Sequence, residues 1–406
     1  MGTGGHMSVH ANSADDTVIL EGVRTPIGKF NGMLSSFMAT DLGGFAIAGV
    51  LECTGVAAAE IDSVVMGHVL TAGEGQSGAR NAAVKGGIPM SVNATTVNKV
   101  CLSGMQAINY AAMQVMTGQA TTVIAGGMES MTNSPHLLMK SRTGYGYGDG
   151  KLIDSLQFDG LTCAIESKIM GTATDEYAAA DSIARDVQDA FAAESHDRAA
   201  RAIKDGLLRS ETITVSVPQR KADPIVFEDD EGVRAGTDAA SLGKLRAVFA
   251  AEGTITAGNA SQISDGASAM VITTRARADE LGVEPLATIL GYGMVAGPDN
   301  CSLLHQPSRA IAAAAERAGV ATSDIELFEI NEAFAAVGLA SADELGVSTD
   351  VINVNGGAIA IGHPLGMSGN RITLTLMHEL RRRGGGIGAA GLCGGGGQGD
   401  AIIVRV

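Results

Sequence analysis

The chain has 406 residues, more than one hydrophobic core normally supports, so we expect at least two packed units. Apolar residues make up 45% of it, and the 55 glycines, about twice the usual share, indicate many close backbone approaches. The formal net charge of −16 argues against nucleic acid or an anionic membrane surface as a partner, because the summed field repels polyphosphate.

Cysteine usage and hydropathy point to a cytoplasmic location. The five cysteines have neither the density of a disulfide framework nor the spacing of a metal site, so we expect reduced thiols and no bound metal. No apolar run reaches the roughly 18 residues of a membrane span. Residues 1–16 are polar and rich in glycine, and we interpret them as a tag remnant with a disordered start. The cysteines are Cys53, Cys101, Cys163, Cys301 and Cys393.

Hydrophobic periodicity in the first part of the chain predicts strands alternating with helices. These elements are expected at residues 17–20, 41–52, 63–70, 93–100, 101–116 and 121–127. Cys101 falls where an extended segment meets a helix. At such a junction, free backbone N–H groups and the helix dipole stabilise a thiolate.

The pattern then changes to a region that we interpret as an insertion. A polar stretch rich in Gly and Tyr is followed by two predicted helices, at about 174–184 and 187–205. Residues 198–246 carry a net charge of +1, unlike the rest of the chain, and are therefore a candidate contact for a small anionic ligand. A strand at 269–274 returns to the α/β pattern.

The second part of the chain repeats the first weakly but in order. The segment T-G-V-A-A-A-E-I-D at 54–62 recurs as A-G-V-A-T-S-D-I-E at 318–326, an offset of 264 residues. Adding this offset to the position of Cys101 gives 365, two residues from His363. Two duplicated units packed face to face would therefore bring these two reactive side chains together.

Three further segments carry candidate functional side chains. His363 lies among glycines in residues 351–369, Asn331 follows a predicted strand in N-E-A-F, and Cys393 lies in the glycine-rich residues 384–399. Simpler interpretations stay open at this point: His363 as a hydrogen-bonded core residue, and Asn331 as a helix N-cap.

These residue types fit acyl transfer. A cysteine needs a histidine or a helix N-terminus to act as a nucleophile at neutral pH. In the predicted fold, Cys101 can have both close to its side chain. A cysteine hydrolase would leave Cys393 unexplained. A second thiol suits an acid/base that acts on a carbon acid, and the resulting enolate needs preorganised donors.

Six motifs together resemble the thiolase family: N-K-V-C-L-S-G, G-G-M-E-S-M, G-N-A-S…D-G-A, N-E-A-F, N-V-N-G-G-A-I-A-I-G-H-P-L-G-M-S-G and C-G-G-G-G. They occur in family order from Val18 to Val406, and the match is nearest the acetyl-CoA C-acetyltransferase type. The resemblance implies an α/β fold of two βαβαβαββ halves in a five-layered αβαβα core with an inserted loop domain. It also implies fatty-acid metabolism, a homotetramer or at least a dimer, and no cofactor, because coenzyme A is substrate or product.

The expected domain boundaries follow from this fold. They are an N-terminal half at 17–130, an inserted loop domain for CoA binding and oligomer contacts at 131–253, and a C-terminal half at 254–406.

Carried over to this chain, the family motif assigns a role to five positions. Cys101 would accept the acetyl group, His363 would activate it, and Cys393 would move the α-proton of the second acetyl-CoA. Asn331, through a water, and His363 would form one oxyanion hole. The N–H groups of Cys101 and Gly395 would form the other.

The resemblance also implies substrate contacts. Ala257 and Ser261 match positions that contact coenzyme A, and Met170, Met294 and Phe334 match positions that line the acyl pocket. The bulk of these three side chains predicts a pocket for a two-carbon acyl group.

The chain departs from many short-chain family members at two places. Ile169 replaces a His before Met170, and the loop at 295–307 is longer. Two alternatives therefore remain, a degradative 3-ketoacyl-CoA thiolase of broader chain length and a non-catalytic acyl-CoA binding protein of the same fold. A β-ketoacyl synthase would have a second His in place of Cys393.

Overall fold

The computed structural model describes residues 13–406, so residues 1–12 of the expected tag segment lie outside it. The core strands form one sheet system in the order β14-β15-β16-β13-β1-β12-β5-β3-β4, with β2 beside β12. The two halves meet at a short antiparallel pairing, where Val18 lies opposite Thr288 and Ile19 opposite Ala287. The core strands are β1 (Thr17–Arg24), β2 (Gly28–Lys29), β3 (Ser63–Gly67), β4 (Asn93–Val97), β5 (Thr122–Ser130), β12 (Ser264–Thr274), β13 (Ala287–Ala296), β14 (Leu327–Ile330), β15 (Ile387–Gly394) and β16 (Gln398–Arg405).

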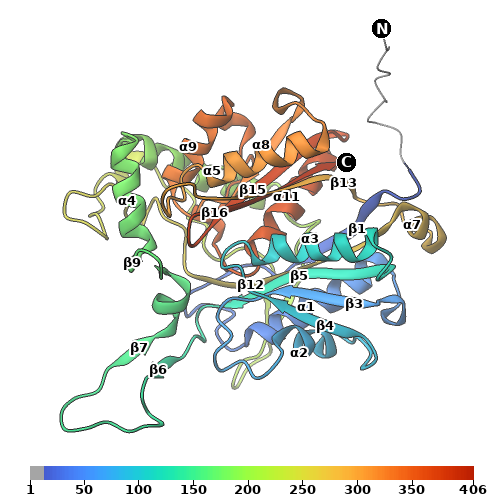
Figure 1. Ribbon diagram of the computed structural model, residues 1–406, viewed down its shortest axis with the longest axis horizontal. Coiled ribbons are helices and arrows are strands. Elements are labelled where there is room, and N and C mark those ends of the chain that lie inside the picture. The colour runs from blue at the N-terminus through green and yellow to red at the C-terminus, as the bar shows by residue number, and fades with distance from the viewer. Residues whose placement is uncertain (1–12) are drawn as a thin grey trace.

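Helices cover both outer faces and fill the space between the halves, which makes five layers (Figure 1). The middle pair, α3 and α11, packs on both halves of the sheet through one apolar cluster that includes Met105, Ile108, Ile372 and Leu376. The principal helices are α1 (Ala39–Thr54) and α2 (Gly78–Lys85) on the first half, α3 (Ser103–Met116) and α11 (Ser368–Arg383) in the middle, and α8 (Gln306–Ala318) and α9 (Ala335–Leu345) on the second half. Two short helices, α7 (Arg275–Leu281) and α10 (Ala358–Ile361), complete the core.

The structure contains the internal repeat that the sequence predicts. The 3₁₀ turn at Ala58–Glu60 and strand β3 recur, at the same offset of 264 residues, as the turn at Thr322–Asp324 and strand β14. The expected boundary at residue 254 differs from the strand pairing, because β12 lies between β1 and β5 of the first half. The first half therefore continues to Thr274.

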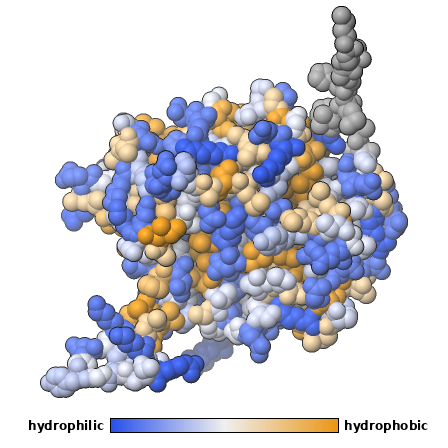
Figure 2. Space-filling view, viewed as in Figure 1, coloured by the Kyte–Doolittle hydropathy of each residue, from blue (hydrophilic) through white to orange (hydrophobic). Residues whose placement is uncertain are grey.

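The region inserted between β5 and β12 contains short elements and a projecting arm. The arm is the hairpin of β6 (His136–Leu138) and β7 (Leu152–Asp154), which extends away from the body, with apolar residues gathered at its base (Figure 2). The remaining elements are the π-helical turn Leu156–Gly160, β8 (Thr162–Cys163), β9 (Lys168–Ile169), α4 (Met170–Ala180), α5 (Arg185–Lys204), β10 (Val215–Val217), β11 (Ile225–Phe227) and α6 (Ala239–Leu242). Within residues 13–406, no helix is both long and apolar enough to cross a membrane.

Candidate active site

Cys101 lies in a tight turn between β4 and α3. The helix begins two residues later, at Ser103, with Leu102 as its N-cap. Val100 has a φ of 53°, a left-handed conformation that is strained for a β-branched side chain. The Ser103 hydroxyl donates to the Val100 carbonyl at 2.6 Å and accepts from the Lys99 N–H at 2.8 Å, which closes the turn. The turn thus holds Cys101 just before the N-terminus of α3.

The Cys101 thiol is surrounded by apolar groups and by two backbone donors. Burial raises its pKa to about 12, although hydrogen bonds from the N–H groups of Cys101 and Gly395 act in the opposite direction. The helix terminus therefore does not produce the resting thiolate that the sequence position suggested. A neutral thiol must lose its proton to a base when it attacks.

Cys393 lies near the end of β15 and faces the same space. Its side chain is buried, and burial raises the pKa of its thiol, as does the neighbouring Cys101. Gly395 follows two residues later, in the turn from β15 to β16. The two cysteines and the Gly395 N–H thus converge from the two halves of the fold.

His363 lies in the loop between α10 and α11. The helix α11 begins five residues later, at Ser368. The Nδ1 atom of His363 lies 2.6 Å from the Ser368 hydroxyl oxygen. Burial, together with the positive charge of Arg371, lowers the pKa of His363 to about 3, so the imidazole is neutral at physiological pH. A neutral imidazole can accept a proton.

Asn331 follows β14 and is not a helix cap, because Phe334 is the N-cap of α9. Its amide Nδ2 lies 3.4 Å from each ring nitrogen of His363. Its Oδ1 is buried without a hydrogen-bond partner. Such an oxygen suits a bound water, which would satisfy it.

Glycines let the His363 loop approach the first half of the fold. A Cβ on Gly127 of β5 would lie 2.0 Å from the Gly366 carbonyl oxygen, and one on Gly104 of α3 would lie 2.7 Å from it. Leu365 packs in the same apolar cluster as Cys101. Backbone contact therefore fixes the position of the His363 loop relative to the nucleophile turn.

Glu129 connects this loop to the first half of the fold, a role that the G-G-M-E-S-M motif alone does not indicate. The buried carboxylate accepts hydrogen bonds from the N–H groups of Val69, Leu70 and Gly366, at 2.8–3.1 Å. Burial raises its pKa, and these donors and His68 oppose the rise.

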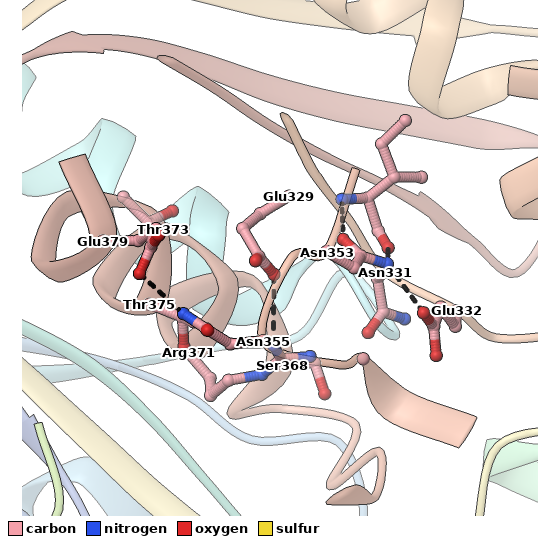
Figure 3. A network of polar contacts seen from close by, with 12 residues as sticks. Glu329, Asn331, Glu332, Asn353, Asn355, Ser368, Arg371, Thr373, Thr375 and Glu379 are labelled. Carbon is pink, nitrogen blue, oxygen red and sulfur yellow. Dashed lines mark hydrogen bonds and ion pairs between the residues drawn. The ribbon is translucent and has the colours of Figure 1, made fainter. Parts of the chain in front are cut away.

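Two more buried carboxylates, Glu329 and Glu332, belong to a polar network near Asn331 and α11 (Figure 3). Glu332 accepts hydrogen bonds from the Ser195 hydroxyl at 2.7 Å and the Asn353 amide at 2.9 Å. Glu329 lies 3.5 Å from Arg371. Sequence reasoning missed these residues, because their partners are far away in the chain.

A cavity of about 610 Å³ leads to His363 from the surface. Four of the expected substrate-contact residues line it, namely Ala257, Ser261, Met170 and Phe334. The substituted Ile169 also lines it. Most of the wall is apolar.

A second cavity, of about 620 Å³, lies on the other side of Met170 and reaches Gly395. Met294 lines neither of these two cavities, so its expected place in the acyl pocket stays a prediction. It is 43% exposed, and its sulfur lies 4.0 Å from the Asn109 amide of α3. In the sheet, Met294 of β13 is paired with Asp400 of β16.

Within the described residues, no group of three or more His, Cys, Asp or Glu side chains is arranged to hold a metal ion.

Comparison with known proteins gives a consistent assignment. The model of the thiolase N-terminal domain matches residues 17–276, and that of the thiolase C-terminal domain matches residues 283–406. A probable acetyl-CoA acetyltransferase of Mycolicibacterium smegmatis is 52% identical over 96% of this chain and 100% of its own length. The acetyl-CoA acetyltransferase of Chromobacterium violaceum is 46% identical over 96% of this chain and 99% of its own length. The crystal structure of the Bacillus anthracis acetyl-CoA acetyltransferase superposes with a TM-score of 0.94 at 36% identity, covering 97% of this chain and 100% of that one.

Proposed function

Because the chain belongs to the thiolase family, we propose that it is an acetyl-CoA C-acetyltransferase, which reversibly converts two acetyl-CoA molecules into acetoacetyl-CoA and CoA. The observation that carries this proposal is that two buried thiols, Cys101 and Cys393, lie close together although they come from different halves of the fold. The Gly395 N–H bonds to the Cys101 thiol, and the neighbouring Cys101 raises the pKa of the Cys393 thiol.

In the first half-reaction, His363 takes the proton of the Cys101 thiol. The sulfur attacks the carbonyl carbon of acetyl-CoA, and the developing oxyanion receives hydrogen bonds from the N–H groups of Cys101 and Gly395. The carbon–sulfur bond to CoA breaks, and the leaving thiolate takes its proton from Cys393. This leaves an acetyl group on Cys101, an imidazolium at His363 and a thiolate at Cys393.

In the second half-reaction, the Cys393 thiolate removes an α-proton from the second acetyl-CoA. Its raised pKa suits this step, because a thiolate of higher pKa is a stronger base. The enolate oxygen receives hydrogen bonds from His363 and from a water held by Asn331. The enolate carbon then attacks the acetyl group, and the released Cys101 thiolate recovers the proton from His363.

The cavity that leads to His363 supports the choice of a CoA thioester. It has an apolar wall for the pantetheine arm, with Ala257 and Ser261 beside it. Lys29 and Arg234 also line it, and they offer positive charge to phosphates in a chain whose net charge is −16.

Exposed apolar residues support self-association, and we propose a homotetramer in the cytoplasm, acting in fatty-acid metabolism. On the arm, Tyr147 is fully exposed and Leu152 is 67% exposed. On α3, Met113 and Met116 are also exposed. Such clusters are typical of contacts between copies. Light scattering coupled to size-exclusion chromatography tests the tetramer, and a monomer would contradict it.

A second candidate, a 3-ketoacyl-CoA thiolase of broader chain length, is favoured by the second cavity beyond Met170. Thiolysis rates separate the two candidates. We expect kcat/KM to fall from acetoacetyl-CoA to 3-ketohexanoyl-CoA and 3-ketodecanoyl-CoA, because each added CH₂ meets a side chain and not empty volume. A value that rises with chain length would contradict the short-chain proposal. Absence of thiolysis with every substrate would indicate a non-catalytic acyl-CoA binding protein.

A further inference from the structure

The hydroxyl of Ser368 makes two short contacts, one with the His363 ring and one with the Pro364 carbonyl group. Its oxygen lies 2.6 Å from His363 Nδ1 and 2.7 Å from the Pro364 carbonyl oxygen. Both Ser368 and His363 are buried, with 1% and 5% of their surface exposed, so bulk water does not compete for these contacts.

Counting hydrogens assigns the direction of both contacts. A serine hydroxyl has one proton, and a carbonyl oxygen can only accept, so the Pro364 contact is a hydrogen bond only if Ser368 donates to it. The contact with His363 is then a hydrogen bond only if Nδ1 carries a proton and Ser368 accepts. In the other tautomer, Ser368 would donate to Nδ1, and two oxygen lone pairs would face each other at 2.7 Å.

Among residues 13–406, the other polar contacts of His363 do not reverse this preference. The Asn331 amide Nδ2 is equally far, 3.4 Å, from Nδ1 and Nε2, so it favours neither tautomer. The main-chain N–H of His363 lies 3.3 Å from both the Gln262 carbonyl oxygen and the Ser264 hydroxyl oxygen, which fixes the residue but not its ring proton.

We propose that Ser368 is a positioning residue that holds neutral His363 as the Nδ1–H tautomer and leaves Nε2 unprotonated. This inference rests on the proposed function, in which His363 takes the proton of Cys101 and then gives a hydrogen bond to the enolate oxygen, and it assigns both roles to Nε2. Holding an imidazole in one tautomer by a hydrogen bond at its other nitrogen is how histidine bases are generally oriented.

The tautomer can be read directly, without any activity. Protein labelled with ¹⁵N-histidine is examined by solid-state NMR, and the His363 signals are those that disappear in His363→Gln. We expect a protonated Nδ1 and an unprotonated Nε2 at His363 in the wild type. Ser368→Ala should give a mixture of both tautomers.

Thr373→Val is the matched control. Thr373 lies on the same helix, is fully buried, and makes the same kind of bond, from its hydroxyl to the Gly369 carbonyl at 2.9 Å, without touching a histidine. Both variants lose one buried hydroxyl bond, so both should lose similar stability. Only Ser368→Ala should lower kcat, by about tenfold to a hundredfold, with KM unchanged.

A wild-type His363 that is protonated at Nε2 would overturn the proposal, whatever the activities are. Equal kcat in Ser368→Ala and Thr373→Val, or an unchanged tautomer in Ser368→Ala, would also overturn it. Failure of the proposed function would give a different result. In that case His363→Gln would still form the acetyl-enzyme, although His363 of the wild type would have the expected tautomer.

Discussion

Replacing Gly127 with Ala tests whether backbone contact positions His363. The new Cβ would lie 2.0 Å from the Gly366 carbonyl oxygen, and contacts of a Cβ under 3.0 Å essentially do not occur, so the His363 loop or β5 must move by about 1 Å. Neither side can yield by rotating a side chain, because the obstructing atom belongs to the backbone. We expect a loss of about 1–3 kcal/mol in the free energy of unfolding. A displacement of about 1 Å in a catalytic group should lower the rate roughly a hundredfold.

The assay measures acetylation of the enzyme by acetyl-CoA, together with urea unfolding. Gly146→Ala is the control, because a Cβ there meets nothing within 4 Å. An acetylation rate within about threefold of the wild type, in a folded Gly127→Ala protein, would refute the reasoning that this contact sets the loop position.

Three further predictions concern the cavity, the pH dependence and the buried carboxylates. Met170→Ala should connect the two cavities and raise kcat/KM for 3-ketohexanoyl-CoA relative to acetoacetyl-CoA. The expected gain is on the order of tenfold, because two more CH₂ groups are buried at about 0.8 kcal/mol each. Met90→Ala, at an exposed methionine, is the control, and an equal ratio of kcat/KM values in the two variants would contradict the prediction. The pKa of His363 is lowered to about 3, so the folded state favours the neutral imidazole. The folding stability that depends on this neutral form is fully present above the ordinary pKa of 6.5 and is lost as the pH falls from 6.5 to 3. His363→Gln should therefore flatten the acid-side loss of unfolding free energy by up to about 1.4 kcal/mol per pH unit in urea titrations, and an unchanged slope would show that His363 is not buried neutral. Glu332→Gln places an amide NH₂ where a carboxylate oxygen accepts hydrogen bonds, and it should cost about 1–3 kcal/mol in unfolding free energy; a loss below about 0.5 kcal/mol would mean that the site readily rearranges.

Much of the fold was predictable because the duplication produces local sequence patterns. Apolar periodicity and the short turns at 54–62 and 318–326 gave the repeat, and the structure reproduces its offset. Helix starts were less reliable: α5 begins at Arg185, earlier than the start expected at about residue 187. Helix termini depend on local backbone geometry that several polar residues can satisfy.

The sequence motifs predicted candidate site residues, but they did not predict how deeply these side chains are buried or what they contact. Motifs indicated Cys101, His363 and Cys393, and their catalytic roles stay a prediction. The raised pKa of Cys101 was not predictable, because burial by segments distant in the chain outweighs the helix terminus. The placement of Met294 and the contacts of Ser368 likewise depend on tertiary packing, which a single sequence does not reveal.

The most direct test of the account is to separate the two cysteines by reaction step. Intact-protein mass spectrometry after mixing with acetyl-CoA should detect one acetyl group on Cys393→Ser, mapped to Cys101, although condensation and thiolysis are lost. Cys101→Ala should carry no acetyl group and should catalyse neither reaction. Equal loss of acetylation in the two variants, or an acetyl group mapped to another cysteine, would contradict the division of roles between Cys101 and Cys393.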